Sequence, residues 1–168
     1  MQRWVKCLTG ALFLAILAGS GGAVAAESAP IPAPTGLWLI QSGKIAVEIY
    51  DCKGRLCGRL VWARADQWPE GKPKIDTNNP DPSLRDRDLC GLDIVWDMKP
   101  SRPGKWVNGH IYDPKKGERS DADLEQTAPD EIRVRGYKVI TWIGKTLVWH
   151  PAPAGLARCD RPQAAANP

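Results

Sequence analysis

Hydrophobic and polar residues alternate over short runs from Gly36 onward, and turn residues separate these runs. In the second run Ile45, Val47 and Ile49 fall on one face and mostly polar residues fall on the other. A period of two is typical of strands that bury one face. Eight such runs follow one another: GLWLIQ, KIAVEIYD, LCGRLVWAR, CGLDIVWDM, KWVNGHIYD, ERSDADLEQ, EIRVRGYK and KTLVWHP. No convincing helical periodicity extends over ten or more residues after the first 26, so the pattern predicts an all-β domain.

Most connections between these runs are short, as at Ser42-Gly43, which is a two-residue hairpin signal. Consecutive antiparallel strands joined by hairpins most simply form an up-and-down meander, and eight of them can close into a barrel. We therefore predict an eight-stranded antiparallel up-and-down barrel. A sandwich of two sheets is the alternative architecture.

The exception is the long segment 65–89, which joins the third and fourth strands and contains four prolines. Loops of this length in a compact domain are usually functional or disordered. Asp81 is placed to cap a short helical turn that starts at Pro82. We expect the half NNPDPSLRDRDL to be ordered against the barrel rim, with Leu84 and Leu89 as apolar anchors.

The first 26 residues differ in character from the rest. Arg3 and Lys6 flank the start of the apolar run CLTGALFLAILA, and small residues lead to Ala25 and Ala26. This order is typical of a secretory signal peptide, and the run is shorter than the roughly 20 residues that span a bilayer. We expect cleavage after Ala25 or Ala26, a periplasmic or secreted protein, and no membrane span. The predicted segments are the signal (1–26), a Pro-rich leader (27–35), the β-barrel domain (36–150) and an Ala/Pro-rich tail (151–168).

Four cysteines remain after the predicted signal: Cys52, Cys57, Cys90 and Cys159. Thiols usually pair in an oxidising compartment, and CxxxxC fits neither a zinc knuckle nor a thioredoxin-like CxxC motif. If the flanking strands form a hairpin, the loop KGRL would place Cys52 and Cys57 opposite each other, within bridging reach. Cys90 would then pair with Cys159. Four cysteines allow three pairings, and the sequence alone leaves the other two open.

Four segments in this order resemble one bacterial family: EIYDCKGRLCGRLVW, DTNNPDPSLRDRDLCGL, GHIYDPKKGERSDADL and IRVRGYKVITWIGKTLVWHP. Over about 36–150 the chain is similar to the exported proteins grouped as domain of unknown function 2147. The resemblance implies a calycin-like, lipocalin-like barrel of eight strands. By analogy of fold it also implies small-ligand binding, although a fold does not fix a function.

The chain departs from the family pattern at two points. Ser120 stands where the family tends to have Tyr, and His150-Pro151 stands where the last strand tends to end in a basic residue. Gly36-Leu37-Trp38 is similar to the Gly-x-Trp opening of calycins, whose Trp usually packs under an Arg from the last strand. Pro151 cannot supply that contact, so Lys145 or Arg135 would have to substitute, or the contact is absent.

Aromatic usage is the most unusual feature of the composition. The only Phe, Phe13, and one of the eight Trp residues lie in the predicted signal, which leaves seven Trp, three Tyr and no Phe. Trp and Tyr combine a large apolar face with a polar group, which suits the mouth of a pocket. Candidate ligand contacts are Trp62, Tyr112 and Trp68, the last in the long loop and best placed for an exposed contact. The alternative is that four tryptophans simply fill the barrel: Trp38, Trp62, Trp96 and Trp149.

Arg135 is the fourth candidate ligand contact. Arg133 and Arg135 alternate with Ile132 and Val134, so both should point away from the apolar face. If the lumen were the polar side instead, Arg135 would become an anchor for an anion.

No cofactor, metal site or catalytic residue is predicted. The segment 76–81, DTNNPD, resembles a calcium loop, but Pro80 occupies the third ligand position, so we interpret it as turn and capping residues. No GxSxG elbow or HExxH motif is present, and the two histidines lie on different strands. A carboxylate pair for glycoside hydrolysis could be drawn from Glu48, Asp93 and Asp97, but among 19 acids some pair always exists.

Charge excludes one class of partner. The predicted signal contains two of the 23 basic residues and none of the 19 acidic ones, which leaves a net charge of +2. Lys and Arg are not clustered, so nucleic acid is not an expected partner. The sequence does not indicate an oligomeric state.

Three functions are compatible with these patterns. The first is an exported barrel that binds a small apolar or amphipathic ligand without converting it. The second is an interaction module of the cell envelope that uses the 65–89 loop, and the third is a hydrolase. The barrel interior discriminates among them. An open cavity favours ligand binding, a filled barrel with an ordered loop favours interaction, and acids or histidines clustered in a cleft favour catalysis.

Overall fold

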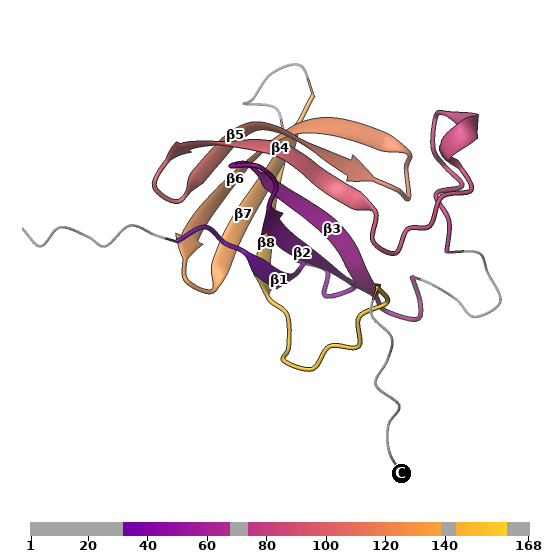
Figure 1. Cartoon of the computed structure of the whole chain (residues 1–168), viewed down its shortest axis with the longest axis horizontal. Helices are drawn as coiled ribbons and strands as arrows, with labels where there is room; N and C mark the ends of the chain where they lie inside the picture. Colours follow the sequence, from indigo (N-terminus) through magenta and orange to yellow (C-terminus); the bar gives the residue numbers. More distant parts are fainter. Residues whose placement is uncertain (1–31, 68–73, 139–143, 161–168) are drawn as a thin grey trace, which may run out of the picture.

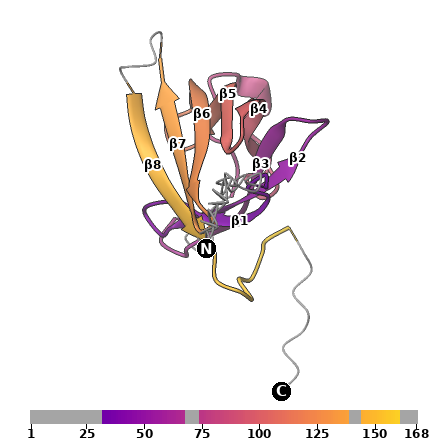
Figure 2. The ribbon, with the colours of Figure 1, turned by 90° about the vertical axis from the view of Figure 1, so that its left-hand side faces the viewer.

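Eight antiparallel strands form a closed barrel in the computed structural model, which describes residues 32–67, 74–138 and 144–160. Each strand pairs with its neighbours in chain order and β8 pairs with β1, as Figure 1 and Figure 2 show. The predicted up-and-down barrel is confirmed, and the two-sheet sandwich is wrong. The strands are β1 (Gly36–Leu39), β2 (Ile45–Asp51), β3 (Leu56–Ala63), β4 (Asp93–Arg102), β5 (Lys105–Asp113), β6 (Glu118–Ala128), β7 (Glu131–Tyr137) and β8 (Gly144–Pro151).

The long connection between β3 and β4 contains the predicted helical turn. It is the short 3-10 helix η1 (Pro82–Leu84), and the Asp81 carboxylate caps it by accepting from the Ser83 N–H at 2.9 Å. Within the described part of the chain, no helix has the length and apolar character needed to cross a membrane.

Three tryptophans fill the end of the barrel at which β1 begins. Trp38, Trp106 and Trp149 are 4%, 8% and 1% exposed. They share this core with Met98, which packs so closely against Gly109 that any larger residue at 109 would collide with it. This end of the barrel is therefore closed by side chains.

Trp38 reaches its place without the arginine that the calycin pattern implies on β8. It lies opposite Pro151 in the β1–β8 pair, and its indole N–H donates to the Pro34 carbonyl at 2.8 Å. Lys145 lies at the other end of β8, opposite Gly136, and so does not take the place of that arginine.

Two of the four tryptophans expected to fill the barrel do not belong to its core. Trp96 pairs with His110 and is half-buried on the outer face. A β-bulge in β3 moves Trp62, because Ala46 pairs with Trp62 while Val47 pairs with Leu60. The extra residue between them places Trp62 on the face opposite to Leu60, which is in the core.

Both disulfides join the predicted partners, Cys52 with Cys57 and Cys90 with Cys159, across Cα–Cα distances of 5.8 and 6.0 Å. The β2–β3 turn is tighter than expected, because the Cys52 N–H donates to the Arg55 carbonyl at 2.8 Å. Lys53 and Gly54 form this turn with φ of 65° and 78°, the positive values that two-residue hairpins need. Cys57 pairs with Tyr50, so the disulfide runs diagonally and the expectation of directly opposed cysteines is wrong.

The chain after β8 returns across the outer face of β2 and β3. The Cys159 N–H donates to the Val61 carbonyl at 2.8 Å, next to the bridge to Cys90. Arg158 is only 8% exposed and forms two hydrogen bonds to Glu48, at 2.7 and 2.8 Å. Arg158 also forms two hydrogen bonds to Asp160 within the tail. The ion pair with Glu48 and the disulfide therefore both tie this tail to the barrel wall.

The two disulfides should stabilise the barrel unequally. The chain-entropy model gives about 2 kcal/mol for the Cys52–Cys57 ring and about 4 kcal/mol for the Cys90–Cys159 ring, because the second closes a much longer loop. We expect Cys90→Ser/Cys159→Ser to lower the free energy of unfolding more than Cys52→Ser/Cys57→Ser. Urea denaturation of both double variants measures this, and equal losses would contradict the ranking.

The Glu48–Arg158 contact should make stability sensitive to acid. Hydrogen bonds from Arg158, opposed by partial burial, hold the pKa of Glu48 at about 2, below its ordinary value of 4.5. A depressed folded pKa stabilises the fold above the unfolded pKa, and this contribution is lost as pH falls from about 5 to about 2. Glu48→Gln should therefore lose stability at pH 7 and show a weaker decline from pH 5 to pH 3 in urea denaturation. Parallel pH profiles for both proteins would contradict this.

Candidate functional site at the barrel mouth

The end of the barrel opposite the three tryptophans contains a cavity of about 430 Å³. This size is within the range of about 300–1,000 Å³ that is usual for small-molecule sites. The cavity is open because inward positions of β6 and β7 here carry Ser120 and Gly136 rather than large side chains. Trp149 lies at its inner end, and the apolar walls come from Ile45, Leu60, Ile94, Ile111, Val134 and Leu147.

Trp149 also contains a buried polar atom. Its indole N–H is buried and has no hydrogen-bond partner among the described residues. A buried donor without a partner costs about 1–3 kcal/mol. Within the part of the chain that it describes, the structure therefore leaves this donor, and likewise the buried Gln126 Oε1 acceptor, without a partner in the barrel interior.

Four lysines surround the cavity: Lys44, Lys115, Lys116 and Lys145. Two carboxylates, Asp113 and Glu118, also line it, so the lining carries more positive than negative charge. The rim of the cavity is polar and its interior is apolar, which is the arrangement that amphipathic molecules require.

The loop between β3 and β4 is fastened beside this mouth by a buried carboxylate, that of Asp76. Asp76 is fully buried, and its carboxylate accepts from the Tyr112 hydroxyl at 2.7 Å and the Asn79 amide at 2.7 Å. Arg87 adds two hydrogen bonds, at 2.9 and 2.8 Å. Burial raises the pKa of Asp76, but these hydrogen bonds outweigh burial and hold its pKa below the ordinary value. The carboxylate is thus kept ionised and joins three separate parts of the chain.

The expected apolar anchors of the loop contribute less than this polar one. Leu84 is 38% exposed on η1 and does not pack against the rim, so its predicted role is wrong. Leu89 is half-buried and lines a smaller cavity between the loop and the barrel. Asn78 holds the loop to the β5–β6 turn by donating to the Pro114 and Lys115 carbonyls at 3.3 and 3.0 Å. The described half of the loop is therefore ordered against the rim, as expected, but mainly through hydrogen bonds.

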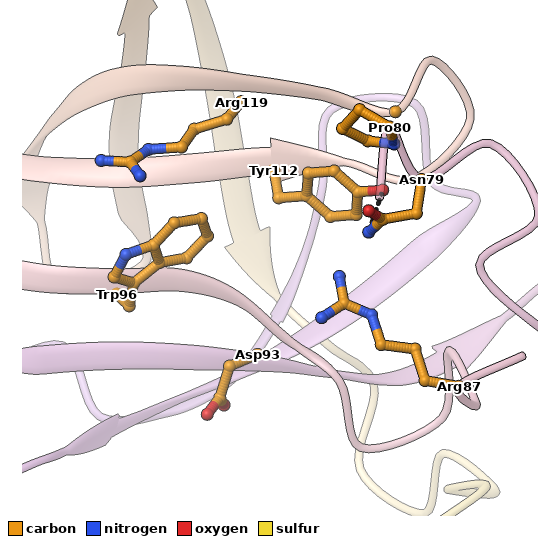
Figure 3. A pocket seen from close by; sticks show the side chains of 8 residues that line it. Asn79, Pro80, Arg87, Asp93, Trp96, Tyr112 and Arg119 are labelled. Carbon is orange, nitrogen blue, oxygen red and sulfur yellow. Dashed lines mark hydrogen bonds between the residues drawn. The ribbon is translucent and has the colours of Figure 1, made fainter. Parts of the chain in front are cut away.

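A second pocket lies on the outer face of β4, β5 and β6, under the same loop (Figure 3). Trp96, Tyr112 and Arg119 line it from the three strands, and Asn79 and Arg87 line it from the loop. The Tyr112 hydroxyl donates to Asp76 and accepts from Asn79, and Asn79 in turn accepts from the Asp81 N–H. Because these polar atoms already have partners, we assign this pocket mainly to anchoring the loop.

The structure separates the four candidate ligand contacts. Tyr112 lines both the mouth cavity and the outer pocket. Trp62 and Arg135 line neither of them, and the Arg135 guanidinium donates to the Thr146 hydroxyl on β8 at 3.3 Å. Trp68 lies outside the described residues.

Sequence reasoning missed the lysine rim and the role of Asp76. The four rim lysines come from three separate parts of the chain, which only barrel closure brings together. Asp76 and Tyr112 are 36 residues apart in the chain. One signal was available, because Asp76 and Arg87 lie in a loop rich in turn and charged residues where such anchors are common.

Among the residues that the structure describes, the acids and histidines considered as catalytic candidates make structural contacts instead. The Arg158 and Arg55 contacts lower the pKa of Glu48 and Asp97, whereas the general acid of a glycosidase needs a raised pKa. Asp93 accepts from the Tyr50 hydroxyl at 2.8 Å. His110 lies between Asp121 at 3.1 Å and Arg119 at 2.9 Å on the outer face, away from the mouth cavity. This geometry favours structural contacts for these groups.

Comparisons with known proteins agree with the geometry. A family model described as "Uncharacterized protein conserved in bacteria (DUF2147)" matches residues 36–151. A similar solved structure is protein HP1028 from the human pathogen Helicobacter pylori, described as belonging to the lipocalin family. It has 22% sequence identity and a TM-score of 0.62, and the match covers 71% of this chain and 83% of that chain. At this identity the likeness shows the fold alone. No curated protein sequence matches the chain significantly.

Removing the Asp76 charge should release the loop from the rim. Asp76→Asn leaves Arg87 without its partner, and breaking a buried ion pair costs up to about 3–5 kcal/mol; the partial exposure of Arg87 reduces this to roughly 2 kcal/mol here. We expect faster amide exchange over residues 75–89 while the barrel strands stay protected. Asp86→Asn, which removes an exposed acid from the same loop, is the matched control. Unchanged exchange in the Asp76 variant would show that other contacts hold the loop.

Proposed function

Because the chain belongs to the DUF2147 family of bacterial proteins and folds as a lipocalin-like barrel, we propose that it is an exported protein that binds a small apolar or amphipathic ligand without converting it. The ligand occupies the cavity at the barrel mouth. The single observation that carries the proposal is this cavity, which is apolar inside and opens at the end of the barrel opposite the tryptophan-filled one.

The barrel interior is filled at one end and open at the other, and this arrangement favours binding over the alternative functions. A barrel serving only as an interaction module needs no cavity, and filling the interior completely would make it more stable. A ligand in the mouth covers apolar walls that water otherwise contacts, which is favourable by about 25 cal/mol per Å² of apolar surface removed from water.

Export is supported by the two disulfides, because such bridges form and persist mainly in oxidising compartments. In this proposal the first 26 residues act as a cleaved signal and the barrel works in the periplasm or outside the cell. Tyr112 remains a proposed ligand contact, since it lies at the boundary of the mouth cavity.

Filling the cavity should abolish binding without unfolding the barrel. At Gly136 a new Cβ would lie 3.5 Å from Ile111 Cγ2 and 3.9 Å from Ser120 Cβ, which are ordinary contacts, so Gly136→Leu is tolerated and enters the cavity. We expect weaker binding of the neutral fluorescent probe N-phenyl-1-naphthylamine, by about 4-fold for each methylene group that no longer fits.

The matched control for this variant is Arg133→Leu, which adds the same side chain to the same strand. Arg133 is exposed, and within the described ranges its one ion pair is with the neighbouring Glu131 at 3.0 Å, so its loss should change stability little. Fluorescence titration should show normal affinity in this control. Equal affinity of Gly136→Leu and the wild-type protein, with both folded by circular dichroism, would contradict binding in the mouth cavity.

A further inference from the structure

We infer that the ligand of the mouth cavity is an anionic amphiphile, with a carboxylate or phosphate head group held by the lysine rim and an apolar chain inside the barrel. This inference rests on the proposed function and specifies the chemical class of the ligand. The observation that supports it is the distribution of charge around the cavity. An apolar binding site does not by itself require a rim of lysines.

The rim charges are not fully neutralised within the protein. Lys116 and Lys145 have no side-chain ion pair or hydrogen bond within the described parts of the chain. Lys115 donates to the neutral Gln67 carbonyl oxygen, which leaves its charge uncompensated. These three ammonium groups therefore remain available to an anion at the mouth.

The acids of the rim do not cancel this charge. The Glu118 carboxylate lies 3.2 Å from the Lys138 ammonium, and the Lys44 ammonium lies 3.4 Å from the Asp66 carboxylate. Asp113 accepts from the Lys115 N–H at 3.0 Å within the β5–β6 turn. One carboxylate without a salt-bridge partner thus faces three lysines without one, so the mouth attracts anions and repels cations.

The orientation of the ligand follows from the cost of burying charge. A carboxylate inside the apolar part of the cavity would lose its hydration without gaining a cation, which is strongly unfavourable. At the rim the same group stays partly hydrated and lies within reach of long, flexible lysine side chains. The head group therefore remains at the rim, and the chain extends toward Trp149.

The test compares three single-chain probes of similar chain length that differ in the charge of the head group: dodecanoate, dodecanol and dodecyltrimethylammonium. Each is titrated against the full-length mature protein below its micelle concentration, in competition with N-phenyl-1-naphthylamine. We expect dodecanoate to bind most tightly, dodecanol less tightly and dodecyltrimethylammonium most weakly. The advantage of dodecanoate over dodecanol should shrink as salt rises from 20 mM to about 500 mM, because exposed charges are screened over a few ångströms at high salt.

Charge variants distinguish the effect of the rim lysines from the effect of the protein's net charge. Lys116→Gln/Lys145→Gln should weaken dodecanoate binding roughly 5-fold, within the range that two exposed ion pairs give, and leave dodecanol unchanged. In the variant Lys116→Glu/Lys145→Glu, dodecyltrimethylammonium should bind more tightly than dodecanoate. The controls are Lys53→Gln/Lys99→Gln and Lys53→Glu/Lys99→Glu, which change the net charge equally at the closed end of the barrel and should preserve the wild-type order.

The outcomes distinguish this inference from the proposed function. If dodecanol binds as tightly as dodecanoate, or if the rim and control variants behave alike, the anionic class is wrong while binding in the barrel stands. If no probe displaces N-phenyl-1-naphthylamine, and octanoate and hexadecanoate also fail, both the inference and the proposed function are overturned.

Discussion

The width of an eight-stranded barrel is the constraint on which the rest of this structure depends. Eight strands enclose an interior that side chains can just fill. The size of each inward-facing side chain therefore decides whether that part of the interior is filled or open. At one end Trp38, Trp106 and Trp149 make it solid. At the other end Ser120 and Gly136 leave space above Trp149. The cavity is therefore a consequence of residue size at a few inward positions, within a fold that otherwise favours a filled core.

The surroundings of the cavity follow from which connections lie at the open end. Odd-numbered strands end there, so the β1–β2, β3–β4 and β5–β6 connections meet around the mouth. The rim consists of lysines near the β1–β2 and β5–β6 connections and of Lys145 at the start of β8. The Asp76 carboxylate holds the longest connection, β3–β4, against the barrel wall. The disulfide turn of Cys52 and Cys57 reinforces the closed end. The tail crosses the outer wall, where Arg158 binds Glu48, and its Cys159 is bridged to Cys90 in the β3–β4 connection.

The strands and the architecture were predictable because alternation and turn residues are local signals. The cap at Asp81 and the pairing of the cysteines came from neighbours in sequence or from their number. The hairpin at Ser42-Gly43 was predicted in place but not in length, because the Ile40 N–H donates to the Ile45 carbonyl around a four-residue loop, 41–44. The errors arose where one residue changes the register. The bulge at β3 moved Trp62 out of the core, and the tight Lys53-Gly54 turn made the first disulfide diagonal. The lysine rim and the Asp76 anchor join distant parts of the chain, and no local pattern contains them.

The central claim is that the open half of the barrel holds a small molecule. Native mass spectrometry of the protein purified from the cells that make it tests this most directly, with Gly136→Leu prepared in the same way. The account predicts one additional mass on the wild-type protein, released on denaturation as an anionic amphiphile and absent from the variant. An additional mass that the variant retains would place the ligand elsewhere. Wild-type protein that shows only its own mass would contradict the claim.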